Sequence, residues 1–281
     1  MNTCCSCILC HEINATLVCR RERWRYVQCK NCGLVWIVPR PSPSELSEQY
    51  KDYLPVDHEE IAAWDRMMRP VVRSSAHLIR TRTGADGGKL LDIGCGFGFF
   101  LREMKNCGWQ VEGVEISPAG IQYIRDRWDI PVHIRPLEEL SLTDNVFDAV
   151  TLFYVIEHVH DPIKLLLEVN RILKPGGFIL LRWPHSTPIV KLLGPLSRKL
   201  NLYHTPYHLY DFAPDTMRTL LHHTGFGYVE TVIGGSTRPS KRAYRIPSVI
   251  FGRLAEIVCR QSHGKFMLPG VSKTTTAFKC S

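Results

Sequence analysis

The sequence lacks the features that mark several special classes of protein. No run approaches the roughly 20 apolar residues of a membrane-spanning helix. The start, MNTCCSCILC, has neither the basic nor the apolar region of a secretory signal peptide. Hydrophobic residues make up 44% of the 281 residues and charged residues 22%, without a disordered or collagen-like bias. We therefore expect a cytoplasmic protein with one large domain and a small extra module.

Acidic residues are scarce in the last third of the chain. From Val190 onward there are 13 Lys and Arg against 4 Asp and Glu, a net charge of +9, whereas the first 189 residues have 22 against 23. Such a basic region can bind nucleic acid, an anionic membrane or an acidic substrate, or can simply be a solvated surface.

Cysteines are concentrated at the start, where seven of the 11 lie within 32 residues. Cys7 with Cys10 and Cys29 with Cys32 form two CxxC pairs separated by 18 residues, a spacing typical of a four-thiolate zinc site. Disulfides fit poorly without a secretory signal. We predict a zinc-ribbon-like module over residues 1–43 with a structural zinc ion. The alternative ligands are Cys4, Cys5, Cys19 and His11.

The remainder of the chain alternates short apolar runs with helical stretches. Residues 44–86 are predicted to form a helical linker or cap. After them, KLLDI, QVEGVEI, PVHIR, FDAVTLF and GFILLRW are candidate strands about 20 to 30 residues apart. Strand–helix repetition of this kind predicts an α/β fold with a parallel sheet covered on both faces, whose ligands bind outside the carboxyl ends of the strands.

Three glycines follow the first of these strands in LLDIGCGFGFFL. Gly94, Gly96 and Gly98 lie where a nucleotide-like ligand would approach the backbone. A dinucleotide fold is one reading, because Glu115 ends the next strand and can accept hydrogen bonds from a ribose. Asp92, however, would repel a pyrophosphate and favour a ligand with ammonium and sulfonium charges. That combination indicates S-adenosylmethionine.

The same stretch resembles the first motif of the class I S-adenosylmethionine-dependent methyltransferases. VEGVEIS resembles their second motif, FDAVTLFYVIEHVHDP the fourth, and LKPGGFILLRWP the turn into the fifth strand. The resemblance implies a Rossmann-like seven-stranded sheet over residues 87–281. PYHLYDFAPDTMRTLLHHTGF and the leading cysteine pairs also resemble a bacterial subgroup that is commonly encoded with enzymes of glycan or secondary-metabolite assembly.

This resemblance also implies roles for individual residues at the cofactor site. Asp92 and Gly94 would flank the methionine portion, Gly96 and Gly98 would let the loop pass beneath it, and Glu115 would bind the ribose. Pro136 stands where the family often has an Asp, which leaves adenine recognition to the backbone near Leu137 and to Glu138. The remaining predicted cofactor contacts are Ile116, which would pack on adenine, and Phe153.

Histidines near the predicted sheet edge are candidates for removing a proton from the acceptor. An alcohol acceptor must lose its proton, and the unperturbed pKa of histidine, about 6.5, suits that task. His158 and His208 are the candidate bases, accompanied by Tyr154 and Tyr207. Each histidine can instead have a structural role, by capping or by a fixed hydrogen bond.

Three functions compete at this point. The first is methyl transfer to a small molecule such as a sugar, a polyketide or a lipid-linked intermediate. The second is nucleic-acid methylation, in which the cysteine module and the basic region grip the polymer. LFYV stands where amino-group methylases have an NPPY-like tetrad, and no stacking platform of aromatics is evident. The third is a cofactor-binding module without catalysis.

A basic insertion at about residues 234–273 separates YVETVIGG from TTTAFKC, which we predict to be the closing antiparallel pair of the sheet. Within it, Ile250, Leu254, Ile257 and Val258 recur at helical spacing, and Arg245, Arg253 and Arg260 lie around the rim. The helix is expected to pack on the domain, to cover the acceptor pocket, or to rest on an anionic membrane.

Overall fold

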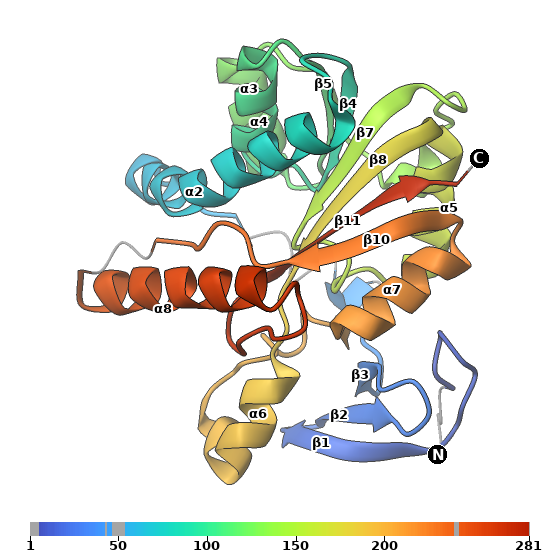
Figure 1. Cartoon of the computed structure of the whole chain (residues 1–281), viewed down its shortest axis with the longest axis vertical. Helices are drawn as coiled ribbons and strands as arrows, with labels where there is room; N and C mark the ends of the chain where they lie inside the picture. Colours follow the sequence, from blue (N-terminus) through green and yellow to red (C-terminus); the bar gives the residue numbers. More distant parts are fainter. Residues whose placement is uncertain (1–5, 43, 47–53, 239–241, 281) are drawn as a thin grey trace.

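The computed structural model describes residues 6–42, 44–46, 54–238 and 242–280. Figure 1 shows a large α/β body, with a small sheet at the bottom formed mainly by the first 40 residues. Within the described residues, no helix combines the length and the apolar character needed to cross a membrane.

The large sheet has seven strands in the order β10-β11-β8-β7-β4-β5-β6. Its strands β4, β5, β6, β7 and β8 run parallel to one another, whereas β11 is antiparallel to both β8 and β10. The predicted Rossmann-like sheet and its closing antiparallel pair are therefore confirmed. The strands are β4 (Lys89–Ile93), β5 (Gln110–Val114), β6 (Val132–His133), β7 (Phe147–Phe153), β8 (Leu173–Trp183), β10 (Phe226–Val232) and β11 (Lys273–Lys279).

Helices cover both faces of this sheet. Neighbouring strand residues supply opposite cores, because successive side chains of a strand point to opposite faces. Leu90 packs with α2 and α3, whereas Leu91 packs in the core that contains α5 and α7. The helices of the large body are α2 (His58–Thr83), α3 (Phe99–Asn106), α4 (Pro118–Arg127), α5 (Pro162–Ile172), α7 (Pro214–His223) and α8 (Arg242–Gln261).

Helix α2 occupies most of the predicted linker or cap. It begins where the Asp57 side chain accepts hydrogen bonds from the backbone N–H groups of Glu59 and Glu60, an N-cap that satisfies two otherwise unpaired donors. It ends at Gly84, whose φ of 64° lies in the left-handed region that glycine adopts without strain. Its buried residues, among them Val72 and Ile79, fix it on the sheet.

The small sheet combines the first three strands of the chain with a strand from much later in the sequence. Its strands are β1 (Ala15–Arg21), β2 (Trp24–Cys29), β3 (Val35–Val38) and β9 (Tyr210–Asp211), paired antiparallel in that order. Strand β9 follows β8 in the sequence and is therefore contributed by the part of the chain that forms the large body. Tyr26 of β2 stacks on Tyr203 with ring centroids 4.1 Å apart. The cysteine-rich module is thus built into the large body.

The chain between β8 and β9 bridges the small sheet and the carboxyl ends of the parallel strands. It contains α6 (Thr187–Leu193) and the 3-10 helix η2 (Gly194–Lys199). Asp211 of β9 accepts hydrogen bonds from the backbone N–H groups of Ser186 and Thr187 at the start of α6. The last strand of the small sheet therefore positions the segment that leaves the end of β8.

Candidate active site

The glycine loop connects β4 to α3 in a conformation that other residues would strain. Gly94, Gly96 and Gly98 have φ angles of 69°, 54° and 72°. A Cβ atom on Gly94 would overlap Cγ2 of Val155, whereas one on Gly96 would meet no atom within 4 Å. The loop therefore packs on the segment that follows β7 and leaves open space at Gly96, where a ligand can approach the backbone.

Glu115 lies directly after β5 and holds this loop in place. Its Oε2 accepts a hydrogen bond from the backbone N–H of Gly96 at 2.7 Å, and its Oε1 accepts from those of Ile116 and Ser117, also at 2.7 Å. A carboxylate has about four lone-pair sites. One acceptor site on Oε2 therefore remains for a hydrogen-bond donor of a ligand.

Asp92 is a buried residue of β4, two positions before the first glycine of the loop. Its Oδ1 accepts a hydrogen bond from the Thr151 hydroxyl at 2.6 Å, and burial raises the pKa of the carboxyl to about 8. A buried carboxyl of this kind is stabilised in its ionised form when a positive charge is bound beside it.

The remaining predicted cofactor contacts differ in which of their atoms a ligand could reach. Ile116 is 55% exposed beside Glu115, so its apolar side chain can pack on a flat ring. Leu137 lies in the 3-10 helix η1 (Leu137–Glu139) with its side chain buried, which leaves only its backbone for recognition. Phe153 is half-buried and packs on Phe100 of α3 with ring centroids 4.7 Å apart. The residues at the loop, Glu115 and Ile116 together fit S-adenosylmethionine.

His158 and His208 are brought together after β7, although 50 positions separate them. Their rings meet edge to face at 4.8 Å, and Nδ1 of His158 lies 3.0 Å from the carbonyl oxygen of Tyr207. Since that carbonyl can only accept, Nδ1 carries the proton and Nε2 is the unprotonated ring nitrogen. Burial lowers the pKa of His158 to about 4, so its imidazole is neutral at pH 7.

Glu157 completes this cluster and was not singled out by the sequence. Its buried Oε1 lies 3.8 Å from Nε2 of His158, and neither carboxyl oxygen has a hydrogen-bond partner among the described residues. Burial raises the pKa of Glu157 to about 8. A largely protonated carboxyl and a neutral imidazole therefore lie side by side in this buried site at pH 7.

The hydroxyl of Tyr154 contacts a different set of residues from the two histidines. Its hydroxyl accepts a hydrogen bond from Nε of Arg182 at 2.8 Å and lies 3.1 Å from Oγ of Ser272. Arg182 is buried and also donates to the carbonyl oxygens of Gly234 and Gly235. The structure therefore places Tyr154 in a network that joins β8 to the segment before α8.

A pocket of about 170 Å³ adjoins this network at the carboxyl end of β8. It is lined by Pro184, His185 and Ser186 after β8, by Ile189 and Leu202, and by Gly270, Val271 and Ser272 before β11. Because Ser272 also contacts Tyr154, the pocket opens on the same edge of the sheet as the glycine loop.

Known proteins place this arrangement in a family. The family described as "Methyltransferase domain" matches residues 64–231, which is more than half of the chain. The chain belongs to that methyltransferase domain family.

Relatives of this methyltransferase domain include a ubiquinone biosynthesis O-methyltransferase of Pseudomonas aeruginosa, 27% identical over 214 residues, which cover 68% of this chain and 92% of that protein. The protein of the same name from Alkalilimnicola ehrlichii is 32% identical over 135 residues, covering 46% of this chain and 55% of its own.

Among solved structures, an S-adenosylmethionine dependent methyltransferase from Mesorhizobium loti superposes with a TM-score of 0.51 at 20% identity, covering 74% of this chain and all of that one. A SAM dependent methyltransferase from Archaeoglobus fulgidus superposes with a TM-score of 0.50 at 20% identity. The match covers 79% of this chain and all of that one. These likenesses support the fold of the methyltransferase domain.

The four predicted zinc ligands lie together at one end of the small sheet. The Sγ atoms of Cys7, Cys10, Cys29 and Cys32 are all within 4.8 Å of one another, with 3.4 Å between Cys7 and Cys32 and 3.5 Å between Cys10 and Cys29. With Zn–S bonds of about 2.3 Å, tetrahedral geometry puts thiolates roughly 3.8 Å apart. The four thiols therefore fit a zinc ion. The alternatives Cys4 and Cys5 lie outside the described residues, and Cys19 and His11 are not in the cluster.

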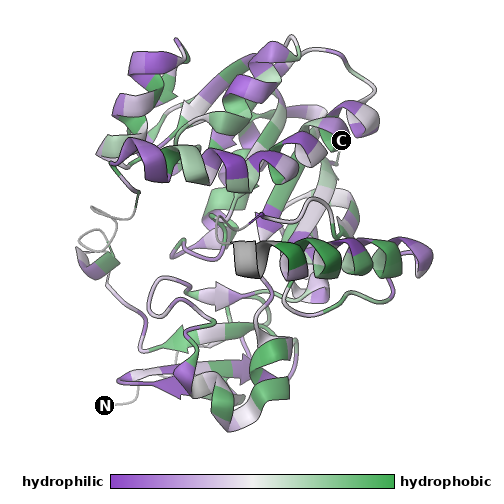
Figure 2. Ribbon diagram, turned by 90° about the vertical axis from the view of Figure 1, so that its left-hand side faces the viewer, coloured by the Kyte–Doolittle hydropathy of each residue, from purple (hydrophilic) through white to green (hydrophobic). Residues whose placement is uncertain are grey.

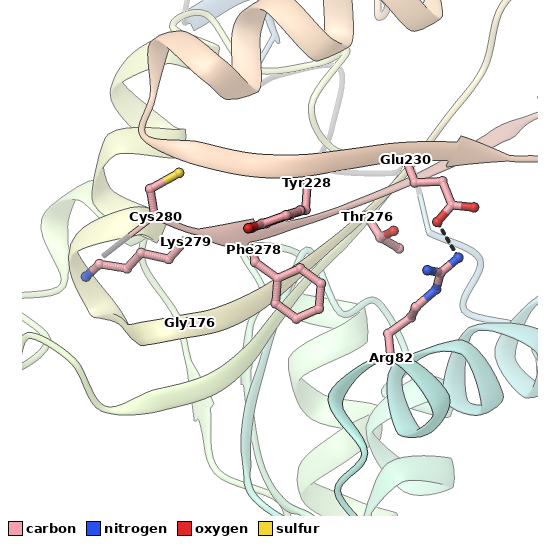
Figure 3. Close-up of a pocket in the computed structure, with 8 residues that line it drawn as sticks. All are labelled: Arg82, Gly176, Tyr228, Glu230, Thr276, Phe278, Lys279 and Cys280. Carbon is pink, nitrogen blue, oxygen red and sulfur yellow. Dashed lines mark ion pairs between the residues drawn. The ribbon is translucent and has the colours of Figure 1, made fainter.

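A second, shallow groove of about 460 Å³ lies on the far edge of the methyltransferase domain. Figure 3 shows Arg82 of α2 paired with Glu230 of β10, beside the aromatic side chains of Tyr228 and Phe278. The groove includes Gly176, near the amino end of β8, whereas the glycine loop follows the carboxyl end of β4. It is therefore not part of the cofactor site.

Proposed function

We propose that this protein transfers a methyl group from S-adenosylmethionine to a small-molecule acceptor. The observation that carries the proposal is the contact between Gly96 and Glu115. Gly96 has open space beside its backbone, and the Glu115 carboxylate that accepts its N–H retains one unused acceptor site. The bound cofactor would supply an electrophilic methyl group, and the protein's own residues would position and deprotonate the acceptor.

The roles of the cofactor-site residues follow from their positions. Glu115 would accept a hydrogen bond from a ribose hydroxyl, and Ile116 would cover the adenine. Asp92 would face the positively charged methionine portion and would ionise when it binds. Gly98 begins α3 in the left-handed conformation, so it turns the chain away from the bound molecule.

His158 is the proposed general base, with a hydroxyl group as the acceptor. With Nδ1 protonated, its Nε2 is the basic ring nitrogen, and Val155, three residues earlier, packs against the glycine loop. A positive charge on the imidazole is unfavourable in this buried site unless an anion forms beside it. Once Glu157 has released its proton to solvent, its carboxylate would supply that anion beside the imidazolium that forms when His158 takes the acceptor proton, and His208 packs against the ring.

The acceptor is proposed to be a sugar, a polyketide or a lipid-linked intermediate that enters the pocket next to Ser272. Relatives named for ubiquinone biosynthesis O-methylation support a small acceptor with a hydroxyl group. We further propose a cytoplasmic location and a zinc ion at the four cysteines. That ion has no open ligand position, so its role would be structural.

Calorimetric titration tests the cofactor assignment. We expect saturable binding of S-adenosylmethionine and of its demethylated product, and no binding of a nicotinamide dinucleotide at the same concentrations. Binding of the dinucleotide in place of S-adenosylmethionine would overturn the proposal, because Glu115 and the glycines would then serve a different cofactor.

A further inference from the structure

Helix α8 carries large apolar side chains on the face that points away from the protein. Ile246, Ile250, Leu254 and Ile257 recur at intervals of four, four and three residues, which places them on one face, and each is at least 50% exposed. Exposed Phe266 follows in the loop after the helix. We call these five residues the apolar outer face. Figure 2 shows α8 as a largely hydrophobic helix along the surface of the body.

The opposite face of α8 attaches the helix to the protein through small residues. Ala255 and Cys259 are buried with Ile233 and Val271. A Cβ atom on Gly252 would overlap the side chain of Ser236, so the helix approaches that segment closely. In an ordinary surface helix the large apolar residues face the core. Here they face outward, which excludes the expectation that Ile250, Leu254 and Ile257 pack on the domain.

Basic residues border the apolar outer face. Arg253 and Arg260 of α8 and Lys265 of the following loop are exposed. Between Ile246 and Phe266 the sole acid is Glu256, which is half-buried. The side chain of Arg245 is outside the described part. A surface with exposed apolar residues and cations along its border is complementary to a bilayer that contains anionic phospholipid.

A second segment of the same character lies nearby. Leu192 at the end of α6, Leu196 in η2 and Leu200 just after it are 78%, 65% and 52% exposed, and Lys191 and Lys199 are exposed beside them. Figure 1 shows α6 and α8 on the left-hand side of the molecule, with α8 above α6. Two separate parts of the chain therefore offer apolar and basic residues on one side.

The acceptor pocket lies between these two segments. Ile189 of α6 lines it from one side, and Gly270 and Val271, which follow α8, line it from another. A surface resting on both segments would therefore adjoin the pocket opening. Enzymes that act on a water-soluble acceptor need no such apolar border, whereas a membrane-borne amphiphile would reach the pocket directly from the bilayer.

We propose that α8 and the α6–η2 segment seat this protein on an anionic phospholipid membrane, and that the pocket between them receives an amphiphilic acceptor from that membrane. Membrane binding stands by itself, whereas the acceptor class rests on the proposed methyltransferase function. The apolar outer face would insert between the lipids, and the arginines and lysines would be attracted to the anionic headgroups.

Vesicle sedimentation with the full chain tests the membrane contact without cofactor or acceptor. We expect binding to phosphatidylcholine vesicles that contain phosphatidylglycerol, much weaker binding to pure phosphatidylcholine, and loss of binding as salt rises. Arg253→Gln with Arg260→Gln should weaken binding about fivefold for each arginine, the equivalent of about 1 kcal/mol. The triple change Ile250→Gln, Leu254→Gln, Ile257→Gln should weaken it at least tenfold.

Matched changes elsewhere on the surface control for charge and exposed apolar area. Arg80→Gln with Arg218→Gln removes two exposed cations, and Leu167→Gln with Tyr228→Gln removes two exposed apolar side chains that belong to neither α8 nor the α6–η2 segment. Both should retain vesicle binding. Circular dichroism and cofactor affinity should stay unchanged in every variant, since none of these residues lies at the glycine loop.

Three results would overturn the proposal. One is absence of vesicle binding by the parent at low salt, and another is equal loss in the control variants. The third is a dimer in size-exclusion chromatography that the triple change dissociates while vesicle binding is absent, because the apolar outer face would then contact a second copy. Vesicle binding together with failure to bind S-adenosylmethionine would refute the methyltransferase function and leave the membrane contact standing.

Discussion

The backbone N–H of Gly96 donates a 2.7 Å hydrogen bond to the carboxylate of Glu115, and this bond ties the end of β5 to the loop that follows β4. One side chain thereby fixes the loop and offers a remaining lone pair at the place where we propose that the ribose binds. The proposed cofactor site is therefore partly assembled before any ligand binds, which reduces the entropy lost on binding.

Replacing Glu115 tests this dual role. Glu115→Ala should weaken binding of the demethylated cofactor product by roughly 1 to 3 kcal/mol, the scale of hydrogen bonds to a charged group. Isothermal calorimetry measures the change. Glu112→Gln, which alters an acid of β5 that pairs with Lys89 and His133, is the matched control and should bind normally. Equal affinities for Glu115→Ala and the parent would remove Glu115 from the site.

Gly94 and Gly176 have the same φ of 69°, so replacing each by alanine distinguishes the effect of a steric overlap from that of backbone strain. Gly94→Ala and Gly176→Ala both force alanine into the left-handed region, at about 1 to 2 kcal/mol. Only the Cβ at position 94 would also overlap Val155. We expect urea denaturation to show the larger destabilisation for Gly94→Ala, accompanied by loss of cofactor affinity. Identical losses of stability would show that the contact between Gly94 and Val155 is not tight.

The pH dependence of cofactor binding tests Asp92. Burial raises the pKa of its carboxyl to about 8 in the free protein. A positively charged ligand favours the ionised form, so binding releases a proton and affinity should increase with pH, by up to tenfold per unit between pH 6 and 7.5. Calorimetry in buffers of different ionisation enthalpy measures the released proton. Asp92→Asn should bind with no such dependence, and a flat profile in the parent would contradict the assignment.

The four-cysteine cluster predicts about one bound zinc ion per chain. Cys29→Ser should lower both the metal content and the melting temperature, because removal of one ligand opens a site whose binding free energy contributes to folding. Metal analysis and thermal unfolding measure the two effects. Cys280→Ser, an exposed thiol at the end of the chain, should change neither. Full zinc content in Cys29→Ser would show that another ligand set holds the metal.

The fold was predictable from sequence because its elements repeat a strong local pattern. KLLDI and QVEGV alternate with helices at regular spacing, and the glycines between them have a backbone requirement that few residues meet. Strand β9 was not predictable, since Tyr210–Asp211 forms two residues of a sheet whose other strands lie more than 170 positions earlier.

The sequence indicates which residue types the candidate site contains, but it does not indicate which residues they contact. The spacing of Ile250 and Leu254 indicates a helical apolar face, but it does not say that Ala255 and Cys259 would take the buried side. Glu157 precedes His158 in IEHVHDP, and an acid next to a candidate base was the available signal. Its burial depends on packing by the distant segment around His208, which the local sequence does not encode.

Methyl transfer from isotopically labelled S-adenosylmethionine tests the central claim most directly. The full chain is incubated with a lipid and small-molecule extract, and labelled products are identified by mass. We predict a labelled, methylated small molecule with the parent and at least a hundredfold less with His158→Asn, which should still bind the cofactor, since general bases contribute roughly 10²- to 10⁴-fold. Absence of any labelled product from the parent despite bound cofactor, or label found solely in nucleic acid, would contradict the account.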